Sequence, residues 1–459
     1  MHSWTRVSKW VANNMNSLKN SLRSLFYYPS AVLGTLVVFL LVFLAIYAMI
    51  KIPYGEAIRL WRGGEDVWYQ NPKFAPPAWI NLFSSKKYAE SFAVRTSDGS
   101  MQKEMTPGAE GTSTMEASYI FDFMSDYYPQ DIILYLTSNY QEKQPFISAE
   151  WLTPDGRKIR LTNLALAQKQ TYRFSQDAKL KTKLRTDDII PALFSDPETG
   201  DLIKGQYQLL ITGATFEPES DINIEFVFHG QVFGIAGTDH ARRDLVLPLL
   251  WGAPVALAFG LLASLGTSVL TMVIAALGTW YGGWVDELIQ RITEINIVLP
   301  FLSILIMIGT FYSRSIWVIL GATILLSIFT TSIKAYRSIF VQVKESMYIE
   351  AARAYGASGS RIVFLYLIPR MIPLLIPGLV SSVPAFVFLE ASLAFLGLGD
   401  PVLPTWGKII ENANSNGALY RGYYYWILEP ATLLMITGLG FAMLGFALDR
   451  VFNPKLRDV

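Results

Sequence analysis

The sequence predicts an all-α membrane protein with six transmembrane helices and a mainly β, sandwich-like insertion between the first and second spans. Three observations predict this fold. Of the 459 residues, 52% are hydrophobic and only 16% are charged, whereas about 25% are charged in a soluble domain. Uncharged runs long enough to cross a hydrocarbon core of about 30 Å recur along the chain. Between them, residues 53–240 are polar and contain no such run.

Composition also limits the chemistry. With 38 Lys and Arg against 37 Asp and Glu, the net charge is +1, so no global basic field exists to bind nucleic acid. Cysteine is absent, which excludes disulfides, thiolate metal sites and cysteine catalysis. The three histidines are scattered, which argues against an all-histidine metal site. We therefore expect no catalytic residue and no metal site.

The first predicted span is the uncharged stretch of residues 31–50. It is longer than the apolar region of a signal peptide, about 7–15 residues. It is followed by Lys51, Ile52 and Pro53 rather than by a small-residue cleavage site. We interpret it as a retained anchor, preceded by a cytoplasmic N-terminal segment, residues 1–30.

Residues 53–240 form the predicted water-exposed domain, mainly β in 115–235. Four stretches alternate and favour β-branched or aromatic residues, which is typical of strands: 131–137, 146–152, 206–212 and 221–228. Residues 154–157, Pro-Asp-Gly-Arg, predict a hairpin turn. Residues 97–114 are rich in Gly, Ser, Thr and Met, and we expect them to form a loop.

Apolar runs return in residues 245–459, the predicted membrane core with five spans. The runs are 245–285, 295–313, 315–333, 371–389 and 427–448. The first is long enough for two spans, but we interpret it as one span preceded by an interfacial helix broken near Pro248 and Pro254. Six spans then place both termini on the same side as the loop 334–370.

Basic residues favour that choice, because short loops rich in Lys and Arg stay in the cytoplasm. The segments placed inside hold fourteen Lys and Arg, six of them in the loop 334–370, whereas the short outer connections hold three. Two spans in the run 245–285 would put that loop outside. We therefore expect cytoplasmic termini and an extracytoplasmic domain at 53–240.

The loop 334–370 carries a distinctive pattern. Residues 350–355 favour a helix, and Ala351 and Ala352 give it a surface without long side chains that another protein can approach closely. Gly356 permits the helix to stop and turn. Gly359 and Pro369 are expected to delimit a second short helix that leads back into the membrane. The pattern predicts a short cytoplasmic helix gripped by a soluble partner.

This segment resembles the EAA loop of ABC importer permeases, with Glu350, Ala351, Ala352, Gly356 and Pro369 in register and Tyr366 and Ile368 departing from the pattern. Further motifs resemble C-type subunits of the dipeptide/oligopeptide subfamily. They are Gly-Thr-Asp-His-Ala-Arg-Arg-Asp at 237–244, where Arg242 replaces a glycine, Gly-Gly-Trp-Val-Asp at 282–286, the Phe-Leu-Gly-Leu-Gly stretch at 395–399 and Pro-Thr-Trp-Gly at 404–407. The resemblance covers residues 237–459 and leaves the outer domain unexplained.

The resemblance implies a permease subunit of an importer for di- or oligopeptides in the prokaryotic plasma (inner) membrane, coupling ATP hydrolysis to alternating access. It implies a B-type permease as heterodimer partner, two cytoplasmic ABC ATPase subunits and an extracytoplasmic solute-binding protein. ATP and Mg would bind at the ATPases and no cofactor at this chain, which lacks the phosphate-loop motif. The implied coupling residues are Glu350, Ala351, Ala352, Arg353, Gly356 and Pro369.

Some alternatives stay open. Glu390 is a carboxylate deep in an apolar run, about 30 Å of helix beyond Arg370 and hence near the outer interface, where a structural or gating role is expected. The outer domain would dock the solute-binding protein, guard the pore mouth or pack on the B-type partner. The cargo remains open between peptide, metal chelate, glutathione-like solute and sugar. The alternative function is a membrane-anchored sensor or envelope-assembly protein with a ligand-binding β domain.

Overall fold

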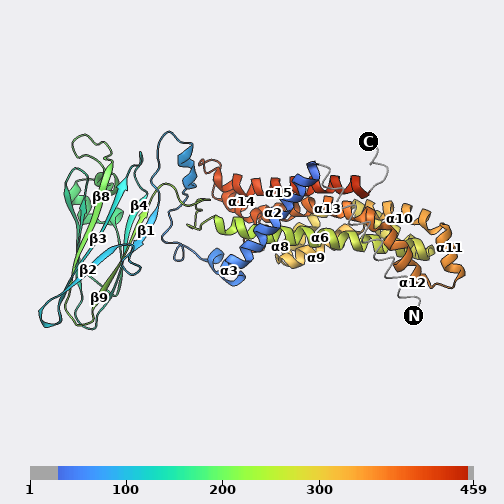
Figure 1. Ribbon diagram of the computed structural model, residues 1–459, viewed down its shortest axis with the longest axis horizontal. Helices are drawn as coiled ribbons and strands as arrows, with labels where there is room; N and C mark the ends of the chain where they lie inside the picture. The colour runs from blue at the N-terminus through green and yellow to red at the C-terminus, as the bar shows by residue number, and fades with distance from the viewer. Residues whose placement is uncertain (1–28, 453–459) are drawn as a thin grey trace. The chain divides into compact units, whose positions relative to one another are not determined.

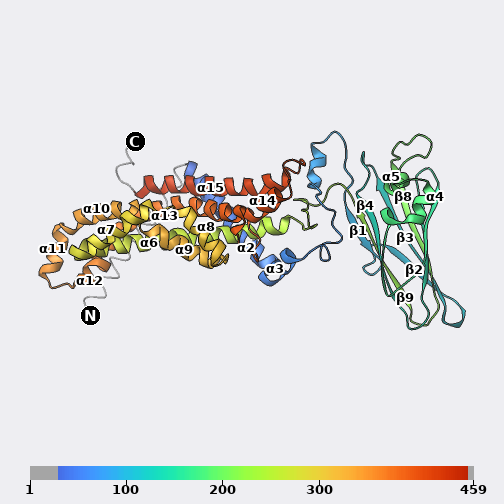
Figure 2. The same ribbon diagram turned by 180° about the vertical axis from the view of Figure 1, so that it is seen from behind.

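The computed structural model describes residues 29–452, which form two compact units (Figures 1 and 2). The helical unit comprises residues 29–62, 247–419 and 427–452, and the β unit comprises 63–246 with 420–426. Nearly all of the predicted cytoplasmic segment 1–30 therefore lies outside the described residues. The helix at 54–62 groups with the helical unit, so the β unit begins at Gly63 rather than at residue 53.

The β unit is a sandwich of two antiparallel sheets. One sheet has the order β1-β9-β4-β7 and the other the order β2-β3-β8-β5-β6. The strands are β1 Phe92–Arg95, β2 Gln102–Pro107, β3 Ser113–Phe123, β4 Asp131–Asn139, β5 Phe146–Leu152, β6 Lys158–Ala165, β7 Lys169–Arg173, β8 Gly205–Thr215 and β9 Asp221–His229. Both sheets contribute to one aromatic core, in which Trp151, Tyr207 and Phe226 are fully buried.

Two short helices, α4 (Ala178–Leu184) and α5 (Ile189–Phe194), add to this core. The carboxylate of Asp177 accepts hydrogen bonds from the amides of Lys179 and Leu180, and so caps the N-terminus of α4. Further short 3₁₀ helices are η1 Ala78–Leu82, η2 Ala109–Gly111 and η3 Phe174–Gln176.

The four predicted strands are confirmed as β4, β5, β8 and β9, and the predicted hairpin turn joins β5 to β6. The expected loop at 97–114 is wrong, because β2 occupies residues 102–107 and pairs with β3 along its whole length. Most of the side chains of β2 are exposed, since it is the edge strand. An edge strand with no buried face has no apolar alternation to reveal it.

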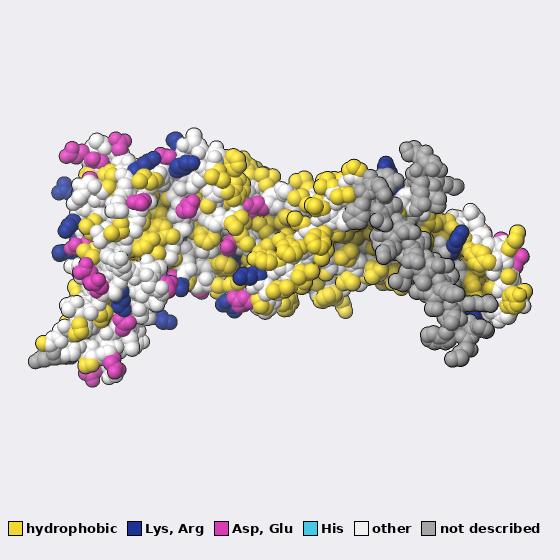
Figure 3. All heavy atoms as spheres, in the orientation of Figure 1, with side chains coloured by type: hydrophobic (Ala, Val, Ile, Leu, Met, Phe, Trp, Pro, Cys, Tyr) yellow, Lys and Arg dark blue, Asp and Glu magenta, His cyan; other side chains and the backbone are white. Residues whose placement is uncertain are grey.

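The helical unit contains four helices that are long and apolar enough to cross a membrane, as judged over the described residues. They are α2 (Pro29–Lys51), α6 (Val246–Tyr281), the helical run 359–398 that includes α13 (Ile368–Leu393), and α15 (Tyr425–Phe452). Figure 3 shows hydrophobic side chains covering much of the visible surface of these helices. Two shorter helices, α3 (Tyr54–Arg62) and α14 (Trp406–Ser415), complete this part of the unit.

Two further helix pairs pass the same test only when each pair is taken together. In the first, α7 (Gly283–Val298) and α8 (Phe301–Phe311) are bent by 80°; in the second, α9 (Ile316–Ile328) and α10 (Thr331–Lys344) are bent by 49°. The runs 295–313 and 315–333, which predicted two of the spans, each contain one of these breaks. At the first break, Pro300 has no amide to donate and holds Leu299 in an extended conformation.

The run 245–285 forms a single helix up to Tyr281, but the expected break near Pro248 and Pro254 is wrong. The 36 residues of α6 continue through Pro254. A proline is tolerated within a membrane helix because neighbouring helices, Ser and Thr side chains and small local adjustments satisfy the backbone groups that it frees.

Candidate functional site

The predicted coupling helix is α11, which spans Met347–Ala354. Glu350 lies in its first turn and Arg353 in its last, where each charge is favoured by the helix dipole. Ile349 anchors the helix, because its side chain is fully buried in a hydrophobic cluster with residues such as Phe340 and Ile362. Sequence reasoning missed Ile349, since no pattern showed which side of this short helix would be covered.

The end of α11 depends on Gly356. Its φ of +78° is in the left-handed region, and two backbone hydrogen bonds close the turn: Gly356 donates to the carbonyl of Arg353 at 2.9 Å, and Ala357 donates to that of Ala352 at 3.0 Å. This pair of bonds is a Schellman motif, which favours glycine at this position. The predicted helix stop is confirmed.

The outward side of α11 is open. Glu350, Ala351 and Arg353 are exposed, while Ala352 is half-buried against the hydrophobic cluster. Met347 and Tyr355, at the two ends of the helix, are 87% and 93% exposed. The site thus presents small, apolar and charged groups together, a surface suited to contact with another protein.

Pro369 does not belong to this surface. It lies half-buried in the first turn of α13, separated from α11 by α12 (Gly359–Ile362) and a π-helical turn, Val363–Leu367. The prediction that Pro369 ends a second short helix is wrong, because the helical run continues to Leu398. A proline is tolerated in the first turn of a helix, and the π turn directly before it adjusts the backbone hydrogen bonding.

The indole of Trp280 connects α11 to the end of α6. The guanidinium of Arg353 lies over its ring, 4.6 Å from the centroid. The ammonium of Lys344 donates to the carbonyls of Thr279 and Trp280 at 2.9 and 3.3 Å, and so satisfies the last carbonyls of α6. A Cβ at Gly359 would lie 2.7 Å from the indole nitrogen, so glycine is needed there. Sequence reasoning missed Trp280, although it lies only two residues before the Gly-Gly-Trp motif.

The motif at 282–286 holds the neighbouring helices together. Gly282 and Gly283, with φ of +63° and +52°, form the turn between α6 and α7. Asp286, in the first turn of α7, accepts two bonds from the Nε of Arg337 in α10 at 2.8 and 3.0 Å, and another from its Nη2. This multidentate pair fixes α7 to α10.

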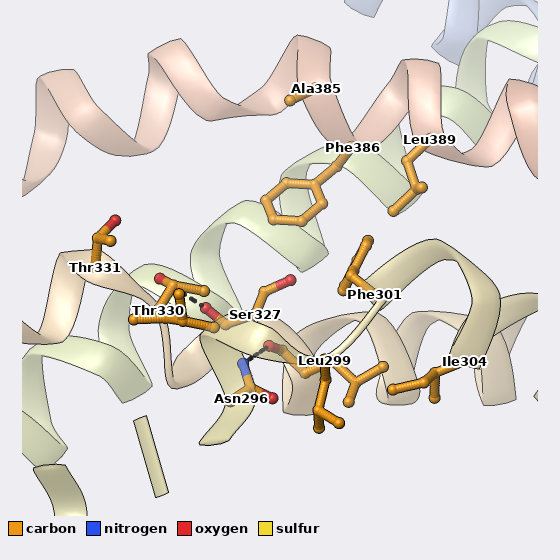
Figure 4. A pocket seen from close by; sticks show the side chains of 12 residues that line it. Asn296, Leu299, Phe301, Ile304, Ser327, Thr330, Thr331, Ala385, Phe386 and Leu389 are labelled. Carbon is orange, nitrogen blue, oxygen red and sulfur yellow. Dashed lines mark hydrogen bonds between the residues drawn. The ribbon is translucent and has the colours of Figure 1, made fainter. Parts of the chain in front are cut away.

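A pocket of about 450 Å³ lies where the two bent pairs break (Figure 4). The side-chain amide of Asn296, near the end of α7, donates to the carbonyls of Leu326 and Phe329, each at 2.8 Å, and so joins the two breaks. In Figure 4, Phe386 and Leu389 point from α13 toward Phe301. The lining residues are Asn296, Ile297, Leu299, Phe301, Ile304, Leu326, Ser327, Thr330, Thr331, Ala385, Phe386 and Leu389.

Glu390 is buried in α13, with only 7% of its surface exposed. Its carboxyl interacts with the side chain of Thr405, which also accepts a bond from Lys408 N at the start of α14. Nearby, Asp400 accepts a bond from the amide of Ile316, the first residue of α9, at 3.0 Å. Both carboxylates therefore lie where helices of this unit begin or end.

In the β unit, the motif at 237–244 is a turn held by hydrogen bonds within it and to the segment 72–75. The hydroxyl of Thr238 accepts from the amide of Ala75 at 3.0 Å and donates to the carbonyl of Pro72 at 2.8 Å. The buried carboxylate of Asp239 accepts from the amide and the Nε of Arg243 at 2.9 and 2.6 Å. These bonds explain why the motif combines Thr, Asp and Arg.

Arg242, at the glycine position of that motif, has a φ of +64°. Its Nη1 donates to the carbonyl of Asn71 at 2.6 Å and lies 3.4 Å from both ring nitrogens of His229. Burial, followed by the charge of Arg242, lowers the pKa of His229 to about 4. The contacts of Arg242 join β9 to the segment around residue 71 and offset the cost of its unfavourable backbone conformation.

Comparisons with known proteins match up to about half of the chain. A family of binding-protein-dependent transport system inner membrane components matches residues 268–458. The dipeptide transport system permease protein DppC of Alkalihalophilus pseudofirmus is 28% identical over 225 residues, 48% of this chain and 72% of that protein. The oligopeptide transport system permease protein OppC of Escherichia coli K12 is 30% identical over 223 residues, again 48% and 72%. The glutathione transport system permease protein GsiD of Pectobacterium atrosepticum is 27% identical over 230 residues, 48% and 73%.

Proposed function

Because the chain belongs to the family of binding-protein-dependent transport system inner membrane components, we propose that it is the C-type permease subunit of an ATP-driven importer for di- or oligopeptides. The names of the dipeptide and oligopeptide permeases it resembles support the choice of cargo. The sensor or envelope-assembly alternative is not favoured, since these relatives are transport permeases.

The proposed topology has six spans, formed by the four long helices and the two bent pairs. Both termini and α11 lie in the cytoplasm, and the β unit lies outside the prokaryotic plasma (inner) membrane. The distribution of Lys and Arg supports this orientation, because it gathers basic residues on the side of α11.

The proposed partners are a B-type permease, two cytoplasmic ABC ATPase subunits and an extracytoplasmic solute-binding protein. The ATPases bind ATP and Mg and hydrolyse the ATP, while this chain contributes the docking surface around Glu350, Ala351, Ala352 and Arg353. The absence of a phosphate-loop motif from the sequence agrees with this division.

The observation that carries the proposal is the attachment of α11 to two other helices. Ile349 is buried in the core, and Arg353 and Lys344 hold the end of α6, which at 1.5 Å per residue extends about 54 Å. The ion pair of Arg337 and Asp286 joins α10 to α7. A movement imposed on α11 is therefore transmitted to α6, α7 and α10.

We assign the pivot of that movement to the two helix breaks joined by Asn296. The pocket of Figure 4 lies at these breaks, and its mixed lining of apolar side chains with Ser327, Thr330 and Thr331 suits peptides, which carry both apolar side chains and backbone amides. In this proposal, the cargo binds in the pocket, and ATP binding at the ATPases moves α11. Pro369 and Glu390 support α13 on either side of the pocket rather than contacting a partner.

The test is reconstitution of the co-expressed complex in proteoliposomes, with peptide uptake and ATP hydrolysis measured together. The variant Arg353→Gln removes the cation–π contact, worth about 0.5–1 kcal/mol at an exposed site, so the complex still assembles while uptake per ATP falls. Arg361→Gln, which removes a charge from exposed α12, is the matched control. Equal uptake per ATP in both variants, or no response of ATP hydrolysis to any peptide, would contradict the proposal.

A further inference from the structure

The β unit exposes an apolar cluster that the sandwich core and the family motifs do not explain. Its members are Trp79, Leu82, Phe83 and Ile235, which are 45%, 79%, 82% and 76% exposed. Trp79 and Leu82 lie on η1, and Phe83 follows directly. We call these four residues the apolar tip. Large apolar side chains gathered at such exposure mark a site of interaction.

The apolar tip is held in place by the backbone around it. The indole nitrogen of Trp79 donates to the carbonyl of Ile235 at 2.8 Å, and the amide of Ala78 donates to that of Gly234 at the same distance. The rings of Trp79 and Phe83 pack edge to face, 6.2 Å apart. The tip is thus a built surface assembled from two segments of the chain.

Asn81 closes the loop that projects Leu82 and Phe83. Its side chain donates to the carbonyl of Tyr88 at 3.1 Å and accepts from the amide of Tyr88 at 2.9 Å. The closed loop therefore keeps the side chains of Leu82 and Phe83 exposed at its head. A closed loop of this kind loses little conformational entropy when its head is buried by a partner.

Two exposed lysines, Lys86 and Lys87, lie on the same loop. The ammonium of Lys87 donates to the carbonyl of Asn81, which places it at the base of the projecting head. The carboxylate of Asp126 accepts from the amide of Lys87, but its ion pair is with Lys204. A positive pair therefore flanks the apolar tip.

We propose that the apolar tip inserts into the outer leaflet of the bilayer, with Lys86 and Lys87 at the level of the lipid phosphates. Segments that bind the membrane interface combine Trp, Phe and Leu with Lys, and lysines beside an anionic surface are attracted to it. Four side chains are also too few for the roughly 800 Å² per partner of a stable protein interface.

Along the chain, the tip is separated from the first residue of α6 by a short segment. Ile235 precedes Val246, the first residue of α6, by eleven residues. Three residues after Ile235, the carbonyl of Thr238 accepts a bond from the hydroxyl of Tyr425, the first residue of α15, at 2.8 Å. The choice of the outer leaflet rests on the topology proposed above, whereas insertion itself does not.

The absence of cysteine allows a direct test. We would place a single cysteine at Phe83→Cys, attach an environment-sensitive fluorophore and reconstitute the whole complex in nanodiscs with or without brominated acyl chains. Ile120→Cys, at a 50% exposed site on β3, is the matched control. The expected result is a blue-shifted emission at position 83 that loses most of its intensity to brominated lipid, with no change at position 120.

Other outcomes overturn the proposal. A label at position 83 that ignores brominated lipid but is shielded by added solute-binding protein or by the partner permease would assign the tip to a protein interface. Unaltered insertion of the double variant Lys86→Gln/Lys87→Gln into anionic lipid would contradict the proposed contact of these lysines with the lipid phosphates. Peptide-stimulated ATP hydrolysis is measured on the same sample. Stimulated hydrolysis without quenching would reject membrane insertion of the tip but not the transport function. Quenching without stimulated hydrolysis would reject the transport function but not membrane insertion.

Discussion

The turn at Gly356 offers the sharpest perturbation of the coupling helix. No atom lies within 4 Å of a Cβ added at Gly356, so a side chain there meets no steric obstacle. The remaining cost is conformational, because a φ of +78° costs an ordinary L residue about 1–2 kcal/mol. A free energy of this size changes the population of the native turn by a factor of about 5–30.

Three substitutions separate conformation from charge. Gly356→Ala carries the full conformational cost. Gly356→Asn adopts the left-handed region more readily and is expected to stay closest to the wild type. Gly356→Asp has the size of asparagine but places a negative charge at the C-terminus of α11, which costs a further 0.3–1 kcal/mol or so through the helix dipole.

The assay is peptide uptake into proteoliposomes, normalised to ATP hydrolysis and to the amount of inserted protein. Insertion should be equal in all three variants, because the buried anchor Ile349 is untouched. Uptake per ATP should fall severalfold in Gly356→Ala and Gly356→Asp and much less in Gly356→Asn. Unchanged uptake in the aspartate variant would refute the role of this turn, and equal losses in asparagine and aspartate would refute the role of charge.

Three further predictions follow from single contacts. Breaking the ion pair with Arg337→Ala or Asp286→Ala should destabilise the complex by about 1 kcal/mol. In thermal unfolding, the double variant should lose less stability than the sum of the two single variants; a loss equal to that sum would show that the two residues do not interact. Asn296→Asp keeps the shape but cannot donate to two carbonyls, so the melting temperature and uptake should fall together, and an unaltered melting temperature would contradict the brace. Burial lowers the pKa of His229 from about 6.5 to about 4, so the neutral form is favoured in the folded state. The contribution of neutral His229 to the free energy of unfolding is present above pH 6.5 and is lost as the pH falls toward 4, by up to about 3 kcal/mol. The variant His229→Gln should therefore show a weaker loss of stability over this pH range, and an equal loss in variant and wild type would exclude this role of His229.

The sequence was most informative where a residue pattern reflects one local cause. The strands β4, β5, β8 and β9 alternate because one side faces the sandwich core, and this alternation revealed them. The stop of α11 was predictable because glycine at Gly356 meets a conformational need. Edge strand β2 was not predictable, because hydrogen bonds to β3 hold it without a buried side.

Features that depend on distant segments could not be predicted in the same way. The apolar counts found the four long helices and the two bent pairs, but hydropathy does not register a bend. Only Pro300 gave a local signal for the first break. The contact of Arg353 with Trp280 joins residues 73 positions apart in the sequence. The left-handed Arg242 could be noticed as a departure from the motif, yet its partners Asn71 and His229 emerged only from the fold.

The central claim is that α11 is held by an ATPase on the cytoplasmic side. The most direct measurement uses two single-cysteine variants of exposed tyrosines, Tyr355→Cys beside α11 and Tyr420→Cys in the β unit, 93% and 99% exposed. We predict that a membrane-impermeant thiol reagent added outside labels only position 420, and that a short crosslinker joins only position 355 to the ATPase, with a yield that changes when ATP binds. Labelling of position 355 from outside, or its failure to crosslink in the assembled complex, would contradict the account.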